Sequence, residues 1–144
     1  MVNIVHMNMQ EIESMVTEAT PAQLIVISYD AAIGYLEHAV AMIKTGDIEA
    51  RWLAVKKATD FIYELYSNLD FEQGGEIAQN LGCLYSFVLS RLPRINFYND
   101  IQTAHDAIAI LKRLRDSWDQ LAAMPPANLD LPASANESSA AIAG

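Results

Sequence analysis

Apolar side chains recur every three to four positions in four long stretches of the chain, and polar or turn residues separate these stretches. Such spacing places the apolar residues along one side of an α-helix. We therefore predict four helices, which run from Pro21 to about Thr45, from the cap Asp47 to Leu69, from about Gly75 to Leu92, and from Asn99 or Asp100 to a point before Pro125.

The ends of the first helix carry the clearest local signals. Thr20 can cap the helix, and Gln23 can complete a capping box. Pro21 occupies the first helical position, where its missing N–H costs nothing. Gly46 is typical of a helix end, because glycine accepts a left-handed backbone conformation.

The stretch from Leu69 to Leu92 lies at the midpoint of the helical pattern and turns the chain back on itself. It contains an acidic turn and then Gly74 and Gly75, which allow the backbone to adopt positive φ. Pro93 disfavours a helical backbone at the preceding residue and predicts the end of this helix. We expect residues 94–99 to form a connector to the last helix.

The short turns between the predicted helices favour antiparallel neighbours. We predict an all-α fold, an antiparallel up-down four-helix bundle over residues 17–124. Residues 1–16 are apolar without a clear single period, and we expect a mobile or partly helical arm. This arm is either a frayed terminus or a cover that lies reversibly over an apolar groove. Residues 125–144 are rich in Pro, Ala, Ser and Asn, so we expect a disordered tail.

The composition is apolar for a small protein: hydrophobic residues make up 52% of the 144 residues, charged residues 19%, and the mean hydropathy is +0.13. We therefore expect an apolar surface patch, which usually marks a partner site. The net charge of −9 disfavours nucleic acid, whose phosphates are bound mainly by Lys and Arg. We expect the small basic clusters to lie on solvated helix faces. These clusters are Lys56 with Lys57, Arg91 with Arg94, and Lys112 with Arg113 and Arg115.

The lone cysteine, Cys83, lies among apolar residues in a helical pattern, and we expect it to be a small buried core residue. The N-terminus has neither the basic segment nor the long apolar segment of a secretory signal. No apolar run approaches the ~20 residues of a transmembrane helix. These features predict a cytoplasmic protein without membrane insertion.

No motif in the chain predicts catalysis or a bound cofactor. A di-iron bundle needs inward-facing Glu-x-x-His sets, and this spacing does not occur. His6, His38 and His105 are scattered, so we expect no metal site. The chain also has no G-x-x-x-x-G-K-[ST] phosphate loop and no G-x-S-x-G signature. We expect a protein that is no enzyme, although a nucleophile set assembled only in three dimensions would leave no local signature.

Aromatic and apolar residues occur on all four predicted helices, and the surplus suits a groove that receives an amphipathic helix of another protein. Eight apolar residues at helical spacing are expected to line either the core or this groove: Leu24, Ile25, Tyr29, Ile33, Leu81, Tyr85, Leu114 and Trp118. The pattern does not separate the two, because core and groove are apolar with the same period.

Three segments carry a family resemblance. The first consists of residues 20–25 (TPAQLI) followed by residues 29–33 (YDAAI). The second, and most specific, runs from Leu69-Asp70 through Gly74-Gly75-Glu76-Ile77-Ala78 to Asn80-Leu81 and Leu84-Tyr85. The third is residues 111–118 (LKRLRDSW). In order and spacing, these segments resemble the first helix, the central motif and the last helix of the flagellar secretion chaperone family FliS.

The resemblance implies a cytoplasmic helical bundle that binds the C-terminal segment of newly made flagellin, which becomes helical as it wraps around the bundle. It also implies that the chaperone prevents premature polymerisation and delivers flagellin to the flagellar export gate. The N-terminal arm of such proteins can fold over the same apolar surface. Two alternatives remain open. One is a structural or regulatory bundle that self-associates, for example as a homodimer, without a flagellin client, and the other is a cofactor-binding or catalytic bundle.

Overall fold

The computed structural model describes residues 3–122, and within this range the chain is all helical, without a strand. The expected all-α class is therefore confirmed. The elements are a 3-10 helix, η1 (Ile4–His6), followed by α1 (Met9–Glu18), α2 (Pro21–Thr45), α3 (Ile48–Ser67), α4 (Phe71–Arg91), α5 (Pro93–Tyr98) and α6 (Ile101–Ala122). The expected disordered tail lies outside the described residues.

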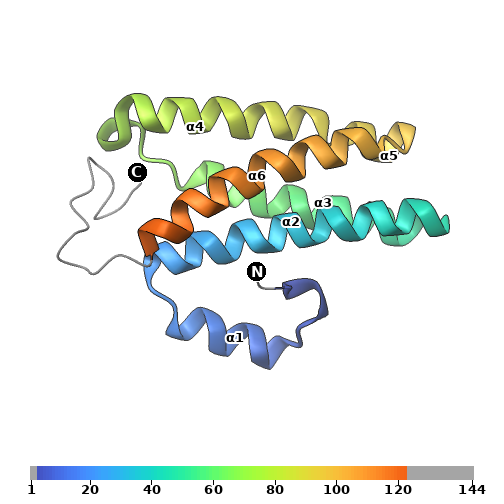
Figure 1. Ribbon diagram of the computed structural model, residues 1–144, viewed down its shortest axis with the longest axis horizontal. Coiled ribbons are helices and arrows are strands. Elements are labelled where there is room, and N and C mark those ends of the chain that lie inside the picture. The colour runs from blue at the N-terminus through green and yellow to red at the C-terminus, as the bar shows by residue number, and fades with distance from the viewer. Residues whose placement is uncertain (1–2, 123–144) are drawn as a thin grey trace.

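The long helices α2, α3, α4 and α6 lie side by side, and in Figure 1 α6 and α3 are seen between α4 and α2. α2 packs most extensively against α3 and α6, and η1 also contacts it. In contrast, α4 packs mainly on α3, and the short α5 links it to α6. Figure 1 places α1 on the far side of α2 from α4. The molecule therefore has two opposite outer sides, one at α1 and one at α4.

The predicted ends of α2 are confirmed. The Thr20 hydroxyl accepts a hydrogen bond from the Gln23 N–H at 3.2 Å, and the Gln23 side chain accepts one from the Thr20 N–H at 2.9 Å. Gly46 ends the helix with φ 78°. Together the cap and the left-handed glycine satisfy backbone groups that the helix ends would otherwise leave unpaired.

The core is centred on α2, whose buried side meets the other long helices. The largest fully buried apolar side chains of the core come from α2, α3, α4, α5, α6 and the junction between α4 and α5, namely Tyr29, Ile33, Leu36, Ile62, Tyr85, Val88, Leu92, Ile95 and Leu111. α2 is also long and apolar enough to cross a membrane by length and composition, and half of its most apolar window is buried. The expectation that no segment reaches this length is therefore wrong for α2, because a central helix needs apolar residues on most sides.

The third long helix begins earlier than the glycine pair predicts. The Asp70 carboxylate accepts hydrogen bonds from the Glu72 and Gln73 N–H groups at 3.1 and 3.0 Å, so a helical turn forms at once. Gly75 then breaks the helix with φ 52° and ψ −128°. The expected positive φ is confirmed at Gly75, where it produces a kink after the first turn.

The expected connector over residues 94–99 is wrong, because most of this segment forms the helix α5. Leu92 adopts a helical backbone, with φ −54° and ψ −35°, although it precedes a proline. Its side chain and that of Ile95 are fully buried. Their burial outweighs the steric preference that the sequence pattern relies on. Pro93 occupies the first position of α5, where a missing N–H does no harm.

The N-terminal segment is partly helical, which is one of the two forms that we expect for the arm. Asn8 and Glu11 form a capping box for α1, which ends at Glu18. The expected burial of Cys83 is wrong, since this residue is exposed. It lies on the outer side of α4, while Leu81 and Tyr85 face the core.

Candidate functional site

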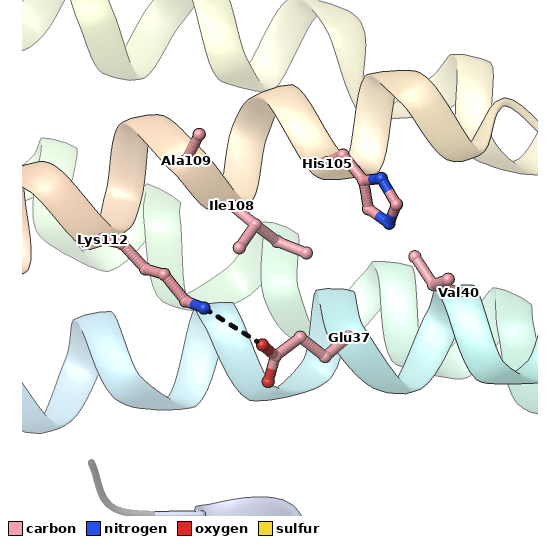
Figure 2. Close-up of a pocket in the computed structure, with 6 residues that line it drawn as sticks. All are labelled: Glu37, Val40, His105, Ile108, Ala109 and Lys112. Carbon is pink, nitrogen blue, oxygen red and sulfur yellow. Dashed lines mark ion pairs between the residues drawn. The ribbon is translucent and has the colours of Figure 1, made fainter.

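A shallow hollow lies between α2 and α6. Glu37 and Val40 line it from α2, and His105, Ile108, Ala109 and Lys112 line it from α6 (Figure 2). The Lys112 Nζ lies 3.5 Å from Glu37 Oε2, so an exposed ion pair bridges the two helices. The floor is apolar and the rim is charged. This combination suits the apolar side of a bound peptide more than a small polar ligand.

A second hollow continues along α2 toward its N-terminal end. It is lined by Met15, Glu18 and Ala19 at the end of α1, by Gln23, Val26, Ile27 and Asp30 of α2, and by Arg115 and Asp119 of α6. We call the two hollows together the α2–α6 groove. The α1 segment forms one wall of the second hollow, so the N-terminal arm already lies over part of this groove.

A buried ion pair forms the base of the second hollow. The Arg115 Nε donates to Asp30 Oδ1 at 2.9 Å, and the side chain of Asp30 is only 1% exposed. Arg115 also lies 3.4 Å from Asp116 and 3.5 Å from Asp119. The pKa of Arg115 is raised, first by the hydrogen bond to Asp30 and then by the nearby negative charges, while partial burial opposes this shift. The pair joins α2 to α6 beneath the arm.

The arm itself is held by few side chains. Ile4 is buried, and a Cβ at Gly34 would lie 3.2 Å from Val5 Cγ2, so the Val5 side chain packs closely against the α2 backbone at Gly34. The rings of His6 and His38 meet edge to face, with centroids 6.5 Å apart. In contrast, α1 buries none of its residues. The arm therefore depends mainly on Ile4 and Val5 for its contact with α2.

Two tyrosines connect α2 with α4 below the groove. The hydroxyls of Tyr29 and Tyr85 share a hydrogen bond in the core. Burial raises the pKa of Tyr85 to about 12. Burial also raises the pKa of Tyr29, and the adjacent Tyr85 raises it further. Both phenols therefore stay neutral under ordinary conditions, and their role is structural.

The eight sequence-predicted residues do not form one surface. Tyr29, Ile33, Leu81 and Tyr85 belong to the buried core. Ile25, Leu114 and Trp118 are partly buried and pack against it, and Leu24 is 37% exposed. None of the eight lines either hollow of the α2–α6 groove.

Sequence reasoning missed the polar residues of the groove. Asp30 is an acidic residue inside an apolar helical stretch, and Arg115 occupies a position at which the fourth helix otherwise repeats apolar residues. A charge at such a position is buried unless it points outward, and a buried charge needs a partner. The two exceptions to the apolar pattern could therefore have been matched with each other. A third buried charge, Arg51, donates to the side-chain oxygens of Asn96 and Asn99 at 3.2 and 2.5 Å, which no pattern indicated.

Exposed apolar side chains also occur away from the groove, on α3, α4 and α5. They include Ile48, Trp52, Leu53, Tyr63, Phe71, Ile77, Leu84, Phe87, Phe97 and Tyr98. The described part of the chain contains no group of three or more His, Cys, Asp or Glu residues that could hold a metal ion. The chemistry of the described surface is that of apolar contact and a few ion pairs.

Comparison with known proteins shows which protein family this chain matches. The family described as Flagellar protein FliS matches residues 5–125. The chain is 37% identical over 111 residues to the flagellar secretion chaperone FliS of Salmonella typhimurium, covering 76% of this chain and 82% of the relative. It is 33% identical to FliS of Vibrio cholerae, with 76% and 81% covered, and 32% identical to FliSB of Pseudomonas aeruginosa, with 75% and 86% covered.

Proposed function

Because the chain belongs to the FliS family of flagellar proteins, we propose that it is a cytoplasmic export chaperone that binds the C-terminal segment of flagellin. It keeps flagellin from polymerising prematurely and delivers it to the flagellar export gate. The relatives are named chaperones, so the chain is a member of a chaperone family and not an enzyme.

The observation that carries this proposal is the α2–α6 groove with the arm over it. The arm buries Ile4 against α2, but its helix α1 has no fully buried residue. A cover of this kind shields apolar surface while the site is empty and gives way when a longer apolar segment arrives. The flagellin segment takes the place of the arm on α2.

Four long helices in an antiparallel up-down bundle are the scaffold of this proposal. The buried side of α2 fixes Tyr29 and Ile33 in the core. A rigid helical floor lowers the cost of binding, because only the client has to become ordered. We assign the buried residues Tyr29, Ile33, Leu81 and Tyr85 to the support of the groove.

Four more exposed candidate residues are each next in sequence to a residue that lines the second hollow, so we assign them to contact with the client at the edge of the α2–α6 groove. These are Leu24, Ile25, Leu114 and Trp118, near the N-terminal end of α2 and the C-terminal half of α6. A segment that folds on binding loses conformational entropy and needs a large apolar footprint to compensate. The net charge of −9 helps to keep such an apolar surface in solution.

The proposal is tested by mixing the purified chain with a peptide of the flagellin C-terminal segment. Calorimetry is expected to give a 1:1 complex, and circular dichroism is expected to show more helix than the sum of the components. A variant that lacks residues 2–7 loses Ile4 and Val5 from the arm, so it is expected to bind the peptide more tightly. If mixing the peptide with the full chain gives no heat and no added helix, the proposal is overturned.

Substitution of an exposed residue separates binding from folding. Leu24→Asp is expected to weaken peptide binding while the unfolding temperature stays close to that of the unmodified chain. Tyr63→Asp on α3 is the matched control, because Tyr63 is exposed and lies away from the groove. Equal binding by both variants would contradict the assignment of Leu24 to the client site.

A further inference from the structure

The outer side of α4 and the start of α5 form an exposed apolar surface. It consists of Ile77, Cys83, Leu84, Phe87, Arg91 and Arg94, and we call it the α4 face. The opposite side of α4 packs on the core through Leu81, Tyr85 and Val88. α4 is thus apolar on two sides, and burial within the chain explains only one of them.

The charge of this region differs from that of the rest of the chain. All 18 acidic residues lie outside residues 77–99, which carry two arginines and no Asp or Glu. The Arg91 guanidinium lies 5.0 Å from the centre of the Phe87 ring, and Arg94 lies 5.1 Å from that of Tyr98. Arg94 also pairs with Asp100, whereas Arg91 has no ion-pair partner among residues 3–122. A locally positive, apolar face therefore exists on a strongly acidic protein.

The two arginines indicate that the partner is acidic. Nucleic acid and anionic membranes, the other acidic partners, fit this face less well. Two arginines are too few to give strong binding to nucleic acid, whose affinity rises with the number of neutralised phosphates. The net charge of −9 opposes adsorption to an anionic membrane surface. The arm of the same chain lies on the other side of α2 (Figure 1). An acidic segment of another protein fits both the apolar residues and the charge.

We propose that the α4 face docks an acidic amphipathic helix of a partner protein. The distance along α4 from Ile77 to Arg91 is about 21 Å, which matches about four turns of a second helix. Apolar residues of that helix at positions i, i+3 or i+4, and i+7 pack between Ile77, Leu84 and Phe87. A carboxylate near one end of it pairs with Arg91. The contact leaves the α2–α6 groove free, so the chain holds a client and this partner at the same time.

The docking test uses two synthetic peptides with the same apolar pattern. The acidic probe is a designed amphipathic helix with Leu at every third or fourth position, three Glu residues on its polar side and no Lys or Arg. In the basic probe the three Glu residues are replaced by Lys. Fluorescence anisotropy of labelled peptides, measured with the full chain, is expected to show binding of the acidic probe that weakens as NaCl is added. The basic probe is expected not to bind.

Cys83 reports the place of binding. It is the only cysteine of the chain, it is exposed, and it precedes Phe87 by one helical turn. The acidic probe is expected to slow alkylation of Cys83 by iodoacetamide. A flagellin peptide in the α2–α6 groove is expected to leave that rate unchanged, so the two sites are followed separately.

A charge reversal provides the sharpest variant. Arg91→Glu is expected to weaken binding of the acidic probe by about fivefold or more, which corresponds to ~1 kcal/mol, and to permit binding of the basic probe. Arg113→Glu is the matched control, because it makes the same change of charge at an exposed position of α6. Circular dichroism checks that both variants are folded.

Several outcomes would overturn the proposal. These are equal binding of the two probes, an unchanged alkylation rate of Cys83, or equal effects of Arg91→Glu and Arg113→Glu. Self-association of the chain alone that Arg91→Glu abolishes would assign the α4 face to a second copy and make the protein a homodimer. Loss of flagellin-peptide binding in Arg91→Glu would assign the face to the client. Intact flagellin binding with no probe binding would leave the proposed function standing and remove only this inference.

Discussion

The two outer sides of the molecule are apolar in different ways. On the α1 side, the α2–α6 groove has ion pairs between its helices, Lys112 with Glu37 and Arg115 with Asp30, and the arm lies over it. On the α4 side, the cations lie over aromatic rings, and no acidic residue occurs between residues 77 and 99. Because the charges of the first side are mostly satisfied within the chain, its selectivity depends on shape. On the second side, Arg91 has no ion-pair partner within residues 3–122, so the partner proposed for this side is selected by charge.

The largest expected effect comes from the buried ion pair of the α1 side. Asp30→Ala leaves the partly buried Arg115 without its closest carboxylate, so the free energy of unfolding is expected to fall by about 3–5 kcal/mol. Urea unfolding followed by circular dichroism measures this change. Asp116→Ala is the control. Asp116 also contacts Arg115, with 3.4 Å between its Oδ1 and Nη1, but its side chain is exposed. Equal losses in the two variants would show that burial of the pair is not what matters.

The tyrosine pair that connects α2 with α4 predicts a loss of stability at alkaline pH. Burial raises the pKa of Tyr85 to about 12, above the value near 10 of an unfolded chain. The resulting stability is fully present below pH 10 and is lost as the pH rises through about 12, at a cost of about 3 kcal/mol.

Unfolding temperatures between pH 8 and 12 test this prediction. The variant Tyr85→Phe has no phenol to ionise at this position, so its stability should depend less steeply on pH above 10. It should also be less stable at pH 8, by about 1–2 kcal/mol, because the buried Tyr29 hydroxyl loses its hydrogen bond to Tyr85. Parallel pH curves for the two proteins would contradict the assignment to Tyr85.

The kink at the start of α4 gives a smaller effect. Gly75→Ala places a side chain on a backbone with φ 52°, so the free energy of unfolding is expected to fall by about 1–3 kcal/mol. Nothing lies within 4 Å of the added Cβ, so crowding does not contribute. Gly82→Ala provides a contrast, because its Cβ would meet the Phe71 ring at 3.2 Å while its own backbone needs no positive φ. A neutral Gly75→Ala would show that the kink relaxes without cost.

The smallest effect on stability is expected at the contact between arm and groove. Gly34→Ala brings a Cβ to 3.2 Å from Val5, so the arm has to shift while the core stays intact. The unfolding temperature should change little, and amide hydrogen exchange in residues 4–18 should become faster. The variant that lacks residues 2–7 serves as the reference for a released arm. Unchanged exchange would mean that Val5 does not hold the arm.

The sequence predicted the ends of α2 well because those ends are fixed by local chemistry. Thr20, Gln23 and Gly46 act within one turn of the helix that they terminate, so no distant contact is needed to infer their roles. The same holds for Asp47, whose carboxylate accepts from the Ala50 N–H at 3.0 Å. Signals of this kind do not depend on how the helices pack.

The wrong predictions concern residues whose conformation or burial depends on packing between segments that are distant in the sequence. Leu92 stays helical before a proline because its side chain and that of Ile95 are buried, and only the assembled fold provides that burial. Cys83 is exposed because the pattern of α4 is apolar on two sides, so a periodic position does not identify the core. For the same reason the eight predicted residues include four core residues and no residue that lines the groove.

The connection between α1 and α2 has a kinetic consequence. Only Ala19 and Thr20 separate these helices, both in extended backbone, so a displaced arm stays close to the surface that it leaves. Its return is a unimolecular step, and the closure of short loops takes about 10–100 ns. A second client has to arrive by diffusion at cellular concentration. Under the proposed function, the arm therefore closes the empty groove after each transfer long before another molecule reaches it, and clients are bound one at a time.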